Sequence, residues 1–160
     1  MKNFSNKKLI IFDLDGTLVD SAPDLALAMN DMLKTLERET FEEELIRSWV
    51  GNGALTLVKR GLSGNVVVDE NLDEVLVQKA LVILLKSYKE NICVKTVAYP
   101  HVIKTLQTLK ERGFTLALVT NKPFEFIAPL FDDMKSILDN KFNIEEVEDK
   151  INAQTLIEKF

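Results

Sequence analysis

The chain has 160 residues, of which 46% are hydrophobic and 28% charged, with a formal net charge of −5. This size and composition fit one soluble globular domain with its own core. The acidic balance gives no electrostatic reason to expect nucleic acid or an anionic membrane surface as a partner. Cys93 is the only cysteine, which excludes an internal disulfide and a cysteine-based zinc site. The apolar run near the N-terminus is too short for a signal peptide and no stretch is long enough for a membrane span, so we expect a cytoplasmic protein.

The first predicted element is a strand over residues 9–12, and two aspartates, Asp13 and Asp15, follow it. A fully apolar run of this kind is typical of a central strand buried on both faces. Aspartates at i and i+2 of a strand would point the same way, and two bare carboxylates beside an apolar sheet are electrostatically costly. An oxygen-liganded divalent cation would compensate, so the sequence predicts Mg²⁺ bound by Asp13 and Asp15.

The same segment predicts chemistry on phosphorus. Asp13 can act as the nucleophile, and Asp15 as the general acid and base at the leaving oxygen. Gly16 allows a tight exit from the strand, and Thr17 offers a hydroxyl and an amide to a phosphate. The alternative is a strand followed by an ordinary Asp-Gly turn, which needs no ligand.

A helical region follows, from about residue 20 to 94. Apolar residues recur at three- and four-residue spacing over 22–33, and further helices are predicted over 41–49, 54–60 and 72–91. Trp49 is expected in the core of this region. Gly51 and Asn52 form a loop whose free amides suit a small anionic substrate, although the loop could equally be a plain link between two helices.

The next predicted elements are a helix over 102–112, ended by Gly113, and a second buried strand over 114–119. Thr120 and Asn121 follow that strand, at the edge where open parallel sheets place ligands, so they are candidates for binding phosphate. Lys122 is either near that phosphate or solvated, and the alternative for the whole string is a turn before Pro123. His101, the only histidine, is expected to be exposed and incidental. The order of elements predicts an α/β fold with a parallel sheet and an inserted helical segment.

Several strings together resemble the haloacid dehalogenase-like hydrolase superfamily, and within it the phosphoglycolate phosphatases most. They are FDLDGTLVDS at 12–21, DSAPDLALAMND at 20–31, WVGNG at 49–53, Tyr99-Pro100, and LALVTNKP at 116–123. The resemblance implies a Rossmann-like parallel-sheet core of residues 1–19 and 95–160 with a helical cap of residues 20–94. It also implies a Mg²⁺-dependent phosphatase of small phosphorylated metabolites, most like 2-phosphoglycolate, that works through a phosphoaspartate. Thr120 matches the second motif of that superfamily.

The resemblance ends near Pro123. No third-motif lysine and no fourth-motif acidic pair are evident after it, and no further core strand, so the core is expected to be incomplete. Asp132-Asp133 lack a preceding strand. The spacing of Ile144, Val147 and Ile151 predicts a short amphipathic helix. A missing neighbour would leave the edge of strand 9–12 open to pairing with another chain.

Two alternative functions follow from this difference. One is a catalytically impaired relative that acts as a binding or interaction protein. The other is a phosphomutase of the same superfamily, which returns the phosphoryl group to its substrate.

Overall fold

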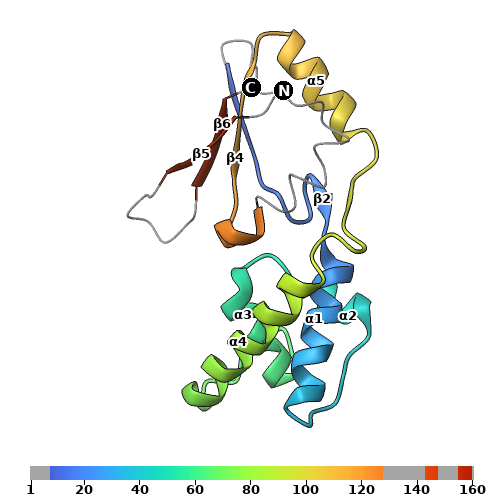
Figure 1. Cartoon of the computed structure of the whole chain (residues 1–160), viewed down its shortest axis with the longest axis vertical. Helices are drawn as coiled ribbons and strands as arrows, with labels where there is room; N and C mark the ends of the chain where they lie inside the picture. Colours follow the sequence, from blue (N-terminus) through green and yellow to red (C-terminus); the bar gives the residue numbers. More distant parts are fainter. Residues whose placement is uncertain (1–7, 128–142, 148–154, 160) are drawn as a thin grey trace. The chain divides into compact units, whose positions relative to one another are not determined.

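The computed structural model describes residues 8–127, 143–147 and 155–159, and the chain divides into two units. The first unit comprises Met1–Val19 and Ala98–Phe160, and the second comprises Asp20–Val97. Figure 1 shows the elements in chain order: β1 (Leu9–Phe12), β2 (Val19–Asp20), α1 (Ala22–Thr35), α2 (Glu43–Arg47), α3 (Gly53–Ser63), α4 (Glu74–Glu90), β3 (Val97–Ala98), α5 (Val102–Glu111), β4 (Thr115–Val119), the short 3-10 helix η1 (Phe124–Phe126), β5 (Asn143–Val147) and β6 (Thr155–Lys159). The chain passes between the units at β2 and β3, which pair with each other.

The first unit contains a four-stranded sheet in the order β1-β4-β6-β5. β1 and β4 are parallel, with Leu9 opposite Thr115 and Phe12 opposite Leu118. β6 is antiparallel to both β4 and β5, and β4 lies between β1 and β6 in the strand order. The parallel pair, joined through a helical region and α5, confirms the predicted α/β class.

β1 is not the buried central strand that its sequence predicts. Leu9 and Ile11 are 52% and 58% exposed, while Ile10 and Phe12 are half-buried. The exposed residues alternate with the half-buried ones, so one face of this strand, which ends the strand order, is uncovered. β4 has neighbours on both sides, and its Leu116, Ala117 and Leu118 are buried. The expected open edge of strand 9–12 is therefore present in the part of the chain that the structure describes.

The C-terminal region contains strands where the sequence predicts a helix and no further core strand. Ile144 and Val147 lie in β5, and Leu156 and Ile157 lie in β6. The predicted helix was wrong because β5 pairs with β6 along its whole length and β6 in turn pairs with β4, and such tertiary pairing overrides a weak helical spacing. Asp132-Asp133 and Ile151 lie outside the described residues.

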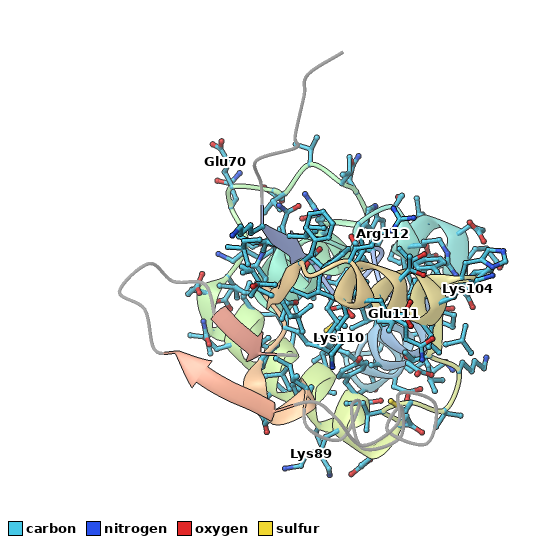
Figure 2. All side chains as sticks on the ribbon, turned by 90° about the horizontal axis from the view of Figure 1, so that it is seen from above. Glu70, Lys89, Lys104, Lys110, Glu111 and Arg112 are labelled. Atoms are coloured by element: carbon cyan, nitrogen blue, oxygen red, sulfur yellow. The ribbon has the colours of Figure 1, made fainter. Side chains whose placement is uncertain are left out.

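α5 has the predicted amphipathic character. Leu106 is buried, and the helix ends before Gly113, whose φ of +80° suits a glycine. His101, exposed as predicted, precedes the helix with a φ of +70°. The charged side chains of this helix and of the residue that ends it are exposed, and Figure 2 labels them: Lys104, Lys110, Glu111 and Arg112.

The second unit is built from α1 to α4. Its core includes side chains that are at most 3% exposed and that come from the helices and, for Trp49, from the turn after α2: Ala26, Met29, Met32, Leu33, Ile46, Trp49, Leu57, Val58, Val77, Ala80, Leu84 and Tyr88. Trp49 is 1% exposed and its ring meets Phe41 edge-on with centroids 5.2 Å apart, which confirms its predicted place in the core. No helix among the described residues is both long and apolar enough to cross a membrane.

A buried carboxylate fixes the segment that leaves the second unit. Asp24, in the first turn of α1, is fully buried and accepts the backbone amides of Lys95 and Thr96, each at 2.9 Å, and the Thr96 hydroxyl at 2.7 Å. A carboxylate out of water requires such donors. Asp24 therefore holds the residues just before β3 against the start of α1.

Candidate active site

The loop after β1 is organised around Leu14. The Leu14 side chain is 1% exposed, and its carbonyl accepts the amides of Thr17, Leu18 and Val19 at 3.2, 2.9 and 3.1 Å. Gly16 has a φ of +79°, a conformation that favours glycine, and its amide donates to Val19 at 2.9 Å. The string Asp-Leu-Asp-Gly-Thr thus folds as a tight loop anchored by one buried leucine.

The geometry of this loop corrects two expectations from the sequence, one about the direction of Asp13 and Asp15 and one about the groups that Thr17 offers to a phosphate. β1 ends at Phe12, so both aspartates lie after the strand and its alternation does not by itself direct them to one side. Asp13 is exposed and Asp15 is half-buried. The amide of Thr17 is already donated to Leu14, so only the exposed hydroxyl of Thr17 remains of the two groups predicted for a phosphate.

The segment after β4 lies beside this loop, because the two strands are parallel and their carboxyl ends meet at one edge. Thr120 is 3% exposed, and its hydroxyl accepts the amide of Lys122 at 3.2 Å. This hydrogen bond turns the chain so that Lys122 points back into the protein, while Asn121 is exposed. The chain thus bends after Thr120, as the alternative reading of this string as a turn also expected, and this places a lysine at the sheet edge.

Lys122 and Asp15 form a buried ion pair. The Lys122 Nζ lies 3.0 Å from Oδ1 and 3.3 Å from Oδ2 of Asp15, and the two side chains are 3% and 16% exposed. A solvated lysine, the alternative in the sequence, is excluded by this burial. The pair joins residues 107 positions apart, so the sequence offered no local signal for it. An ammonium in a poorly solvated setting at this edge is attractive to a phosphate group.

The other two predicted site residues, Gly51 and Asn52, belong to the second unit. Both are exposed, and Asn52 stands at the N-terminus of α3. Gly51 and Gly53 have φ values of +126° and +83°, so both positions require glycine for conformational reasons. The loop predicted from Gly51 and Asn52 is therefore present, with a backbone conformation that depends on the glycines on both sides of Asn52.

Two arginines beside this loop were missed from the sequence, where nothing marks their partners. Arg47 donates to Asp20 at 2.5 Å and to Glu43 at 3.0 Å. The hydrogen bond to Asp20, followed by that to Glu43, raises the pKa of Arg47 above its usual value, against an opposing effect of burial. Arg60 donates to two backbone carbonyls, those of Trp49 and Val66.

Comparison with known proteins gives a consistent result. A family model described as haloacid dehalogenase-like hydrolase matches residues 7–158. A phosphoglycolate phosphatase of Colwellia psychrerythraea is 46% identical over 153 residues, which cover 96% of this chain and 65% of that protein. One of Pseudomonas syringae pv. tomato is 51% identical over 128 residues, covering 80% of this chain and 46% of that protein.

A solved structure described as a predicted phosphoglycolate phosphatase from Haemophilus somnus superposes with a TM-score of 0.70 at 37% identity, covering 82% of this chain and 59% of that one. A second, from Lactobacillus delbrueckii, gives a TM-score of 0.72 at 27% identity, covering 79% of this chain and 59% of that one. The chain thus spans about half to two thirds of the length of these relatives.

Proposed function

The chain belongs to the haloacid dehalogenase-like hydrolase family, and from this premise we propose that it hydrolyses phosphoric monoesters of small metabolites, 2-phosphoglycolate first among them. The observation that carries the proposal is the Lys122–Asp15 ion pair next to Asp13, at the common carboxyl edge of β1 and β4. The substrate class comes from the names of the similar proteins, both phosphoglycolate phosphatases.

The proposed reaction is a double displacement at phosphorus. An Asp13 carboxylate oxygen attacks phosphorus as the bond to the ester oxygen breaks. Asp15 enters this step protonated, which requires Lys122 to leave the ion pair for the phosphate, and gives its proton to the departing ester oxygen. Asp15 then removes a proton from the water that attacks the phosphoaspartate, which releases inorganic phosphate and restores Asp13. Lys122, Thr120, Asn121 and the Thr17 hydroxyl are proposed to hold the phosphate oxygens.

The donor set fits Mg²⁺. Both acidic groups supply carboxylate oxygens, and Mg²⁺ in proteins commonly uses one or two carboxylates and keeps several waters. Asp13 and Asp15 are the proposed protein ligands. When bound, Mg²⁺ would neutralise charge on the phosphoryl oxygens.

The test is hydrolysis of 2-phosphoglycolate and of p-nitrophenyl phosphate by the purified chain, with Mg²⁺ and with EDTA. We expect Mg²⁺-dependent turnover that Asp13→Asn abolishes, because an amide cannot act as the nucleophile. Asp69→Asn is the matched control, since Asp69 is an exposed aspartate of the second unit. Turnover that survives in Asp13→Asn would refute the mechanism, and absence of turnover in the folded wild-type chain would refute the function.

A second pair of variants tests Lys122. Lys122→Met keeps most of the side-chain volume and removes the charge, so we expect kcat to fall by about tenfold or more. Lys122→Arg keeps the charge and should retain more activity than Lys122→Met. Equal activity of Lys122→Met and the wild type would show that this ammonium does not act on the phosphate.

A further inference from the structure

Strand β1 has one open edge among the described strands, because it ends the order β1-β4-β6-β5. The amide of Thr115 in β4 donates to the Lys8 carbonyl at 2.6 Å, so the Lys8 carbonyl points toward β4. Backbone groups alternate sides along a strand, so those of Ile10 also face β4, whereas the amides and carbonyls of Leu9 and Ile11 face the open edge. Such a row of backbone groups is a template for a further strand.

The same two residues carry the exposed apolar side chains of this strand. Leu9 is 52% exposed and Ile11 is 58% exposed. Residues at i and i+2 of a strand lie on one face, so the two side chains form a short apolar row beside the open edge. An added strand with apolar side chains on that face would cover part of this row. The backbone and the side chains of β1 therefore both favour the addition of a strand.

The charges at the two ends of β1 select the direction of the added strand. Lys8 precedes the strand and Asp13 follows it, and both are exposed. When two copies pair antiparallel, the start of each strand lies beside the end of the other, so Lys8 of each copy comes near Asp13 of the other copy. A parallel pair would bring lysine near lysine and aspartate near aspartate. Opposite charges across a strand pair stabilise it and like charges destabilise it, so the edge of β1 is complementary to itself in the antiparallel direction.

We propose that two copies of this chain associate by antiparallel pairing of their β1 strands. Leu9 of each copy lies opposite Ile11 of the other, and each such pair exchanges two backbone hydrogen bonds. The two-fold axis passes between the two Ile10 residues, and the sheet continues from one copy into the other. A contact related by a two-fold axis closes with two copies, so the expected species is a dimer. The inference does not depend on the proposed function.

Sedimentation velocity of the whole chain over a series of protein concentrations tests the dimer. Two paired four-residue strands form a small interface, so we expect a monomer–dimer equilibrium with a Kd on the order of 100 µM. Ile11→Lys places a charge in the middle of the exposed edge and should weaken the dimer by about tenfold or more. Val82→Lys is the matched control, since Val82 is 67% exposed on α4 of the second unit, and it should dimerise as the wild type does.

Three results of this experiment would overturn the inference. They are a wild-type chain that stays monomeric at millimolar concentration, a wild-type chain that forms species larger than a dimer, and an Ile11→Lys variant that dimerises as strongly as the wild type. Loss of the dimer in Val82→Lys would equally contradict it, because it would place the contact on the second unit.

Exchanging the charges at the ends of β1 tests the direction of pairing. Lys8→Glu leaves both ends acidic and Asp13→Lys leaves both ends basic, so each variant alone should dimerise more weakly than the wild type. An equal mixture of the two should form a heterodimer, because each basic end again lies near an acidic one. A mixture that associates no better than the separate variants would refute antiparallel pairing.

Amide hydrogen exchange identifies the surface that pairs. As the protein concentration rises, exchange should slow at Leu9 and Ile11, whose amides face the open edge. Exchange at Ile10 should stay the same, because its amide faces β4 at every concentration. Slow exchange of Leu9 and Ile11 in the monomer would show that another segment of the same chain occupies the edge, and the inference would then be wrong.

Discussion

Variants that remove the Asp24 carboxylate or one of its donors should lower the free energy of unfolding of the second unit by an amount that depends on how many hydrogen bonds are lost. Asp24 accepts three hydrogen bonds, one from Lys95 on Oδ1 and two from Thr96 on Oδ2. Hydrogen bonds to a charged group contribute about 1.5–3 kcal/mol each, and a donor left unsatisfied in a buried site costs about 1–3 kcal/mol.

Asp24→Asn keeps one carbonyl oxygen for Thr96 and places an NH₂ against the Lys95 amide, so we expect a loss of about 2 kcal/mol. Asp24→Ala removes all three acceptor contacts and leaves their neutral donors without a partner, so about 3–5 kcal/mol is expected. Thr96→Val removes one hydroxyl donor and leaves the carboxylate with two amides, so about 1 kcal/mol is expected.

Urea unfolding followed by Trp49 fluorescence measures these costs, because Trp49 is the only tryptophan and lies buried in the same unit. Asp24 and Thr96 are in contact, so the double variant Asp24→Ala/Thr96→Val should cost less than the sum of the two. An Asp24→Asn variant within about 0.5 kcal/mol of the wild type would refute the account, because surface substitutions commonly fall in that range.

Three further substitutions test the packing, by urea unfolding. Gly61→Ala should cost about 1–3 kcal/mol, because its Cβ would lie 2.3 Å from the sulfur of the fully buried Met29, and Met29→Ala in the same chain should relieve part of this cost. Arg47→Met should cost about 1 kcal/mol, since its ion pair with Asp20 is partly exposed to solvent. A double-mutant cycle that gives an Arg47–Asp20 coupling energy above about 3 kcal/mol would contradict this partial exposure. Ile11→Thr, followed by circular dichroism, should change stability by less than about 0.5 kcal/mol because Ile11 is 58% exposed, and a loss of about 2 kcal/mol would show that its face is covered.

Much of the local structure could be predicted because its signals are local. Apolar spacing over 22–33, 72–91 and 102–112 corresponds to α1, α4 and α5, and the run 114–119 to β4. The Gly16 turn also follows from its own residue type. The chemistry-bearing string around Asp13 and Asp15 could be found in the same way, since its residue types and spacing are visible without a fold.

The sequence by itself determined the helical segments, the β4 strand, and the family to which the chain belongs, because each depends on residues within one short stretch. Only the tertiary structure decided that β1 is exposed on one face, that the tail pairs with β4 as strands, and that Lys122 meets Asp15. Burial of a strand's side chains depends on which elements of the fold pack over its two faces. Likewise, the partner of a lysine depends on which distant loop the fold brings within about 3 Å, and no local pattern carries that information.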